Sequence, residues 1–97
     1  MKKLNELSKS DLLLIFQALS DPIRLDIFLC LLKSKEKRFS GETYNISKST
    51  MSHHIKLLKE AQLINLRKEG TTHIYSVNEG LVEQISFFFD SCKNKLK

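Results

Sequence analysis

The side chains best suited to binding chemistry lie close together in residues 47–60, where three lysines stand among serines and histidines. Hydroxyl groups and imidazole nitrogens can form hydrogen bonds at base edges, and lysine ammonium groups can reach the phosphates beside a groove. The chemistry that this stretch supports is therefore contact with a nucleic acid. The residues that we expect to make this contact are Lys48, Ser49, Ser52, His53 and Lys56.

Helical periodicity places these polar side chains on one face. Met51, Ile55 and Leu58 are spaced i, i+4 and i+7, so they share one side of a helix and must face the core. Ser47 is a good N-cap for a helix over about 48–61. The serines, His53 and the lysines then lie on the outward face of this helix.

A basic β-hairpin is expected directly after the helix. Residues 63–68 alternate in polarity as a strand does, residues 69–70 are a Glu-Gly turn signal, and residues 72–77 are rich in β-forming residues. A basic hairpin tip suits contact with phosphates or with the minor groove. The hairpin residues that we expect to touch the nucleic acid are Arg67, Lys68 and Thr72.

The elements that must position this unit are helical. A first helix is predicted over about 9–19, and the Ser-Asp-Pro sequence at 20–22 predicts a second helix over about 22–33, capped by serine or aspartate with proline at N1. The second helix is apolar over a wide arc, which favours a central, largely buried position. Residues 33–38 form a charged connection, and residues 39–46 fit either a short helix or an irregular turn. This order of elements, closed by a last helix over about 79–95, is typical of a winged helix-turn-helix domain, mainly α within the α+β class.

The last helix carries Phe87, Phe88 and Phe89 in succession, and three consecutive side chains cannot all point to one side of a helix. A small monomer would leave some of these rings in water, which indicates a partner surface. The best candidate for the partner is the equally apolar first helix of a second copy. The residues assigned to this homodimer interface are Leu12, Phe16, Leu81, Ile85, Phe88 and Phe89.

Histidine and cysteine could in principle bind a metal ion, but their spacing is unfavourable. His53 and His54 point about 100° apart on a helix, so they do not suit one ion. We expect His54 to pack at the edge of the core or to bond locally. Cys30 and Cys92 are far apart and belong to no CxxC motif. We therefore expect no metal or other cofactor, and both cysteines should act as small buried side chains.

Size and charge agree with a DNA-binding domain. The 97 residues suit one domain over 1–97, and the formal net charge is +5. Residues 33–38 hold four basic side chains against one acidic, and residues 47–73 hold five against two. Clustered positive charge suits a polyanion such as double-stranded DNA.

No run of apolar residues is long enough for a signal peptide or a membrane span, so we expect a soluble, cytoplasmic protein. No catalytic constellation is visible, which argues against an enzyme.

Two motifs resemble the ArsR (ArsR/SmtB) family of winged-helix repressors. Residues 18–27, ALSDPIRLDI, are similar to the family's "ALSDPTRLRIL" opening, and residues 49–61, STMSHHIKLLKEA, are similar to its recognition helix "STVSHHLKVLREAG". Residues 63–75 resemble the family's wing. The resemblance spans roughly residues 10–80 and implies a homodimer that pairs through its first and last helices. It also implies release of an operator when an effector binds, but the sequence does not identify the effector.

The chain departs from the family pattern in several places. Gly41 stands where a helix former is expected, which resembles a branch with a shortened helix before the recognition helix. Gln62 replaces the glycine that normally closes the recognition helix. The "CVC" pair of an arsenic-type site is missing, and the last helix offers only Asp90 and Cys92 where a zinc-type site needs aspartate and histidine.

The sequence thus predicts a sequence-specific DNA-binding repressor that binds an inverted-repeat operator as a homodimer. Its DNA-reading unit spans about 39–77, and residues 9–19 and 79–95 are the dimerisation helices. One alternative is a repressor of the same fold that senses a metal or an oxidant through cysteine. Another is a winged-helix protein-interaction module that uses its phenylalanine surface to hold a different partner and does not bind DNA.

Overall fold

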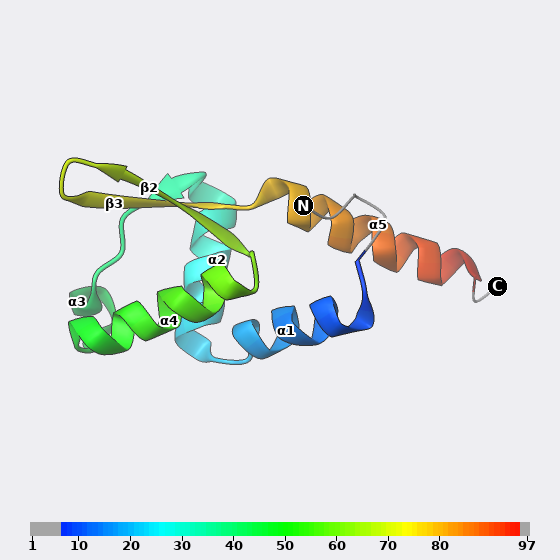
Figure 1. Ribbon diagram of the computed structural model, residues 1–97, viewed down its shortest axis with the longest axis horizontal. Coiled ribbons are helices and arrows are strands. Elements are labelled where there is room, and N and C mark those ends of the chain that lie inside the picture. Colours follow the sequence, from blue (N-terminus) through cyan, green and yellow to red (C-terminus); the bar gives the residue numbers. More distant parts are fainter. Residues whose placement is uncertain (1–6, 96–97) are drawn as a thin grey trace.

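The computed structural model describes residues 7–95. Figure 1 shows the hairpin and α4 at one end of the molecule and α5 extending from the other end. The helices expected at 9–19, 22–33, 48–61 and 79–95 are all present. In chain order, the elements are α1 (Lys9–Leu19), α2 (Pro22–Ser34), β1 (Glu36–Lys37), α3 (Gly41–Tyr44), α4 (Lys48–Glu60), β2 (Ile64–Glu69), β3 (Thr72–Val77) and α5 (Glu79–Lys95).

Local capping explains where α1 and α2 begin. Ser8 Oγ accepts a hydrogen bond from the Asp11 backbone N–H at 3.1 Å, and the Asp11 carboxylate accepts one from the Ser8 N–H at 2.9 Å. This reciprocal pair is a capping box. Asp21 caps α2 by accepting from the Ile23 and Arg24 N–H groups, and Pro22 occupies N1, as the sequence predicts.

The core lies between α1, α2, α4 and the sheet. Ile27 and Leu31 of α2, Leu58 of α4 and Leu63 after it are the largest fully buried side chains. Met51 and Ile55 are also buried, which confirms the predicted inward face of α4.

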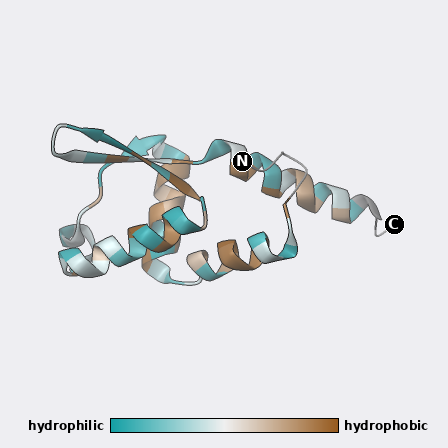
Figure 2. Ribbon diagram, in the orientation of Figure 1, coloured by the Kyte–Doolittle hydropathy of each residue, from teal (hydrophilic) through white to brown (hydrophobic). Residues whose placement is uncertain are grey.

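The prediction that α2 is largely buried is wrong on one side of the helix. Leu25, Leu29 and Leu32 are between 40% and 47% exposed. The reason is that α1, α4 and the sheet pack against the opposite face, which carries Ile27 and Leu31. Figure 2 shows apolar residues concentrated on α1 and α2 and recurring along α5.

The sheet has three antiparallel strands in the order β1-β3-β2, one more than the expected hairpin. Lys35 ends α2 with φ 63° and turns the chain, so that Glu36 and Lys37 pair with Ser76 and Tyr75 of β3. Residues 33–38 therefore include a strand of the sheet as well as the predicted connection. Such a short edge strand is held by backbone hydrogen bonds and leaves no side-chain pattern that the sequence could reveal.

Residues 39–46 contain one helical turn, α3, which resolves the choice between a helix and an irregular turn. Asn45 ends α3 in the left-handed region, and the Ile46 N–H donates to the Gly41 carbonyl at 2.9 Å. A Cβ on Gly41 would lie 2.2 Å from the Ile46 carbonyl oxygen. Glycine is required here because two backbone segments approach closely, and this accounts for the departure from the family pattern.

Helix α4 ends in a Schellman motif with a glutamine at the left-handed position. The Leu63 N–H donates to the Leu58 carbonyl at 3.1 Å, and the Gln62 N–H donates to the Lys59 carbonyl at 2.9 Å. Gln62 has φ 61°, a conformation that favours glycine.

Replacing Gln62 with glycine should therefore stabilise the fold by about 0.5–1 kcal/mol, because it relieves the left-handed strain. The Asn78 side chain donates to the Gln62 backbone carbonyl at 2.8 Å, and this bond survives the change. Urea unfolding would show a higher midpoint for Gln62→Gly. The matched control is Gln62→Ala, which removes the same side chain without relieving the backbone. An equal midpoint for both variants would contradict the strain argument.

Candidate nucleic-acid interface

The outward face of α4 is free of neighbouring chain segments, as expected. The five side chains predicted to contact DNA from this helix are all exposed. Ser47 Oγ accepts from the Thr50 N–H at 3.1 Å and also lies 3.2 Å from Ser49 Oγ, so the first turn is well ordered. The amino end of α4 adds the partial positive charge of a helix dipole, which favours a nearby phosphate.

The two basic residues of the wing lie on opposite faces of the hairpin. Lys68 pairs with His73 in the register, and Arg67 pairs with Ile74. Directly opposed residues share one face of a sheet, and successive residues alternate. Lys68 therefore lies on the face that carries Tyr75, whereas Arg67 lies on the other face.

Arg67 is held by two carboxylates of its own chain. Its guanidinium donates to both carboxylate oxygens of Glu36 at 3.2 Å, and it also pairs with Glu69. The hydrogen bonds with Glu69, and then those with Glu36, raise the pKa of Arg67. Its positive charge is thus already balanced within the sheet, by Glu36 of β1 and Glu69 of β2. The sequence could not reveal this ion pair with Glu36, because 31 positions separate the two residues.

A groove of about 350 Å³ separates α4 from the wing. Of its lining residues, only Ser52 and Lys56 are among the predicted DNA contacts, and Lys59 and His73 are further side chains there that could contact DNA. The i, i+3 spacing of Lys56 and Lys59 is the signal that could have identified Lys59. The residues that line the groove are Ser52, Ile55, Lys56, Lys59, Glu60, Leu66, His73 and Tyr75.

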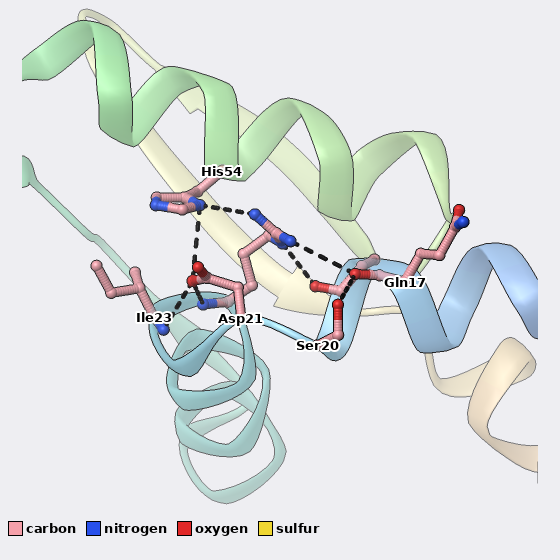
Figure 3. A network of polar contacts seen from close by, with 7 residues as sticks. Gln17, Ser20, Asp21, Ile23 and His54 are labelled. Atoms are coloured by element: carbon pink, nitrogen blue, oxygen red, sulfur yellow. Dashed lines mark hydrogen bonds and ion pairs between the residues drawn. The ribbon is translucent and has the colours of Figure 1, made fainter.

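Polar contacts tie the buried side of α4 to the junction of α1 and α2 (Figure 3). The Arg24 guanidinium lies 3.1 Å from His54 Nδ1, and Asp21 lies 3.9 Å from the same nitrogen. His54 is buried, which confirms its expected packing at the core, but its hydrogen-bond partner Arg24 lies 30 positions away and is not local. Burial alone would raise the pKa of Asp21, but backbone hydrogen bonds from Arg24 and Ile23, together with the charge of Arg24, lower it below its ordinary value.

Contacts of the aromatic residues Tyr44 and Phe39 hold α3 against α2 and the sheet. The Tyr44 hydroxyl donates to Asp26 of α2 at 2.6 Å, and its ring stacks on Phe39 at a centroid distance of 6.4 Å. Phe39 also lies 6.5 Å from Tyr75 of the sheet. Burial and the hydrogen bond to Asp26 raise the pKa of Tyr44. Thus α3 is fixed to both α2 and the wing.

The residues assigned to a dimer interface divide into two groups. Leu12 and Leu81 are buried in the chain's own core, which leaves little of either side chain for a partner surface. Ile85 and Phe88 are half-buried, and Phe16 and Phe89 are 50% and 47% exposed. Periodicity indicates which residues share a face but not whether that face is covered internally. Further exposed apolar side chains on the same helices are Leu13, Leu14 and Phe87.

The chain is similar to known regulators along most of its length. Residues 19–67 match the family described as a helix-turn-helix domain. The chain is 34% identical to the arsenical resistance operon repressor of Staphylococcus xylosus, over 91% of this chain and 94% of that protein. The chain belongs to the ArsR family of winged-helix transcriptional repressors.

Two further proteins agree with this assignment. The transcriptional repressor SdpR of Bacillus subtilis (strain 168) is 38% identical over 71% of this chain and 78% of its own. A crystal structure of an ArsR family transcriptional regulator aligns with a TM-score of 0.73 at 19% identity, covering 93% of this chain and 95% of that one, which shows the fold. The predicted ArsR family resemblance and winged-helix fold are confirmed. As an ArsR family member, the chain is a DNA-binding regulator and not an enzyme.

Neither alternative to a DNA-binding repressor gains support from these relatives. Cys30 and Cys92 are free and half-buried. Within residues 7–95, no group of three or more histidine, cysteine, aspartate or glutamate side chains is arranged to hold a metal ion. The helices of this described part also lack the length and apolar character needed to cross a bilayer.

Proposed function

We propose that this ArsR family chain represses transcription as a homodimer that places two copies of α4 in successive major grooves of an inverted-repeat operator. The observation that carries the proposal is the exposed polar face of α4 beside the basic groove under the wing. In this arrangement, Ser49, Ser52 and His53 contact base edges, and two recognition helices lie about 34–36 Å apart.

Affinity comes mainly from lysines around this face. Lys48 and Lys56 flank the serines on α4, and Lys68 extends this surface onto the wing, whereas Thr72 lies on the other face of the hairpin, with Arg67. Each neutralised phosphate releases counterions, so these contacts strengthen binding to any DNA sequence. Arg67 contributes less to this term than Lys68, because Glu36 and Glu69 already balance its charge.

The proposed dimer is supported by the sparse packing of α5 within a single chain. This 17-residue helix makes few contacts with the other helices and strands of its own chain. In proteins, most of the stability of a helix comes from tertiary packing of its apolar face. Phe87 and Phe89 of α5 and Phe16 of α1 remain exposed. A second copy that covers these rings supplies the missing packing.

Replacing Lys56 with alanine tests the DNA-facing surface. We expect weaker binding to both a random duplex and a selected operator, with the slope of log K against log salt reduced by about one unit for each bound copy of the chain. Fluorescence anisotropy at several salt concentrations would measure this slope. Lys68→Ala should have a similar effect. Arg67→Ala is a less clean probe, because it also leaves Glu36 and Glu69 unpaired.

Lys93→Ala is the control for this experiment. It removes the same charge from the far end of α5, well away from α4 in Figure 1, and should leave the slope unchanged. If Lys56→Ala and Lys68→Ala both keep the full wild-type slope, the face of α4 and the wing do not contact phosphates as proposed.

A further inference from the structure

Three helices meet at the side chain of Arg24, which lies near the start of α2. We propose that Arg24 and His54 form a positioning link that fixes the rotation of the recognition helix relative to α1. The inference rests on the proposed function, since the orientation of α4 matters because that helix reads DNA. Arg24 and His54 are positioning residues in this account and do not themselves touch DNA.

One side of the link is the carboxyl end of α1. Arg24 Nε donates to the Ala18 carbonyl oxygen at 2.7 Å, and Nη2 donates to the Gln17 carbonyl oxygen at 3.4 Å. Ser20 Oγ donates to the same Gln17 oxygen at 2.7 Å. The last carbonyls of a helix have no partner within that helix, and a positive charge there is also favoured by the helix dipole. The guanidinium is thereby fixed to the end of α1, where Figure 3 shows Gln17 and Ser20.

The other side of the link is His54, on the buried face of α4. Arg24 Nη1 lies 3.1 Å from His54 Nδ1, and the ring is only 8% exposed. Because a guanidinium can only donate, Nδ1 must be the acceptor, and the ring proton of neutral His54 is then on Nε2. Asp21 lies farther from Nδ1, at 3.9 Å, and its nearer oxygen already accepts from two backbone N–H groups. Arg24 is therefore the partner that orients the ring.

A directional contact at this position controls which side chains α4 presents. Apolar packing between α1, α2 and α4 is non-directional and tolerates small rotations of a helix, whereas a hydrogen bond weakens as its angle departs from linearity. His54 is adjacent to His53 and two residues from Ser52, so a rotation that breaks the link moves both groups at the DNA-facing surface. The α1 end of the link lies on the helix that carries the exposed Phe16.

The test compares specific and non-specific DNA binding by the full chain. One probe is a duplex enriched by the wild-type chain from a random-sequence pool, and the other is a scrambled duplex of the same length and composition. His54→Leu removes the acceptor, whereas His54→Asn keeps an amide oxygen near the place of Nδ1. Arg24→Lys keeps the charge but cannot bridge α1 and α4 as the fork of arginine does. Circular dichroism melts show that each variant is folded at the assay temperature.

We expect His54→Leu and Arg24→Lys to lower the ratio of specific to scrambled affinity about tenfold, the size of coupling expected for directly contacting residues. Binding to the scrambled duplex should change less than about twofold, since phosphate contacts tolerate small displacements. His54→Asn should retain most of the ratio. The matched control is Ile27→Val, which removes a buried methylene from α2 without altering the link and should leave the ratio unchanged.

An unchanged ratio in folded His54→Leu and Arg24→Lys would overturn the inference while leaving the proposed function intact. The inference would also be overturned if Ile27→Val lowered the ratio as much as these variants, because general loosening of the core would then explain the effect. A wild-type chain that binds neither duplex would overturn the proposed function, and the inference with it.

Discussion

Replacing Gly41 with alanine is expected to destabilise the fold by about 1–3 kcal/mol, the range typical of forced overpacking. The added methyl group would lie 2.2 Å from the Ile46 carbonyl oxygen and 3.2 Å from the Ser47 carbonyl oxygen. Both atoms belong to the backbone, so relief requires the turn between α3 and α4 to open. Opening this turn also breaks the hydrogen bond from the Ile46 N–H to the Gly41 carbonyl. The recognition helix then loses the element that braces its amino end.

Thermal unfolding would measure this loss, since about 1 kcal/mol shifts the midpoint by about 4–8 °C in a domain of this size. Affinity for a selected DNA duplex, measured well below the new midpoint, should also fall. Gly80→Ala is the matched control. A Cβ on Gly80 would meet its nearest atom, Asn78 Oδ1, at an ordinary 3.5 Å, and alanine is the better helix former. We expect this control to raise the midpoint. A Gly41→Ala protein as stable as wild type would show that α3 and α4 do not approach as described.

Replacing both Phe87 and Phe89 with glutamate is expected to convert the proposed dimer into a monomer at micromolar concentration. The two rings are 57% and 47% exposed in one chain. Burying a phenylalanine side chain contributes about 1.5–3 kcal/mol, and two-fold symmetry counts each substitution twice. Glutamates placed there would also add four negative charges to the interface. The half-buried Phe88 is left unchanged, so that the packing of α5 on its own chain is preserved.

Sedimentation equilibrium would give the mass, which should fall from twice the chain mass of 11.2 kDa to that of one chain. Affinity for an inverted repeat should drop by a factor on the order of 10²–10⁴, because the second half-site is no longer bound at high effective concentration. Glu83→Gln changes an exposed polar residue of the same helix and should remain dimeric. A dimeric double variant would remove these two rings from the interface.

Predictions that depend on neighbouring residues agree well with the structure. The cap at Asp21, the inward row of Met51, Ile55 and Leu58, and the turn at Gly70 each involve residues within a few positions of one another. The sequence also indicated that Gly41 was unusual in a helix. Only the structure gave the reason, which is the close approach of the Ile46 carbonyl oxygen.

Predictions of burial were less successful, because a periodic apolar face does not say which neighbour covers it. Leu12 and Leu81 pack inside the chain, although both were assigned to a partner. Leu25, Leu29 and Leu32 of α2 remain exposed, although that helix was expected to be central. Each apolar row was located correctly in the sequence, but its surroundings depend on helices that pack from elsewhere in the chain.

The sequence by itself determined the order of the helices and the hairpin, and the helix that carries the side chains proposed to face DNA. These properties follow from caps, periods and turns, all of which act over three or four residues. The family was indicated separately, by the resemblance of two motifs. The tertiary structure decided the contacts between residues far apart in the chain. It added the edge strand β1, placed Glu36 against Arg67 and brought Arg24 to His54. Such contacts depend on how the helices and strands pack together, and no local pattern encodes that packing.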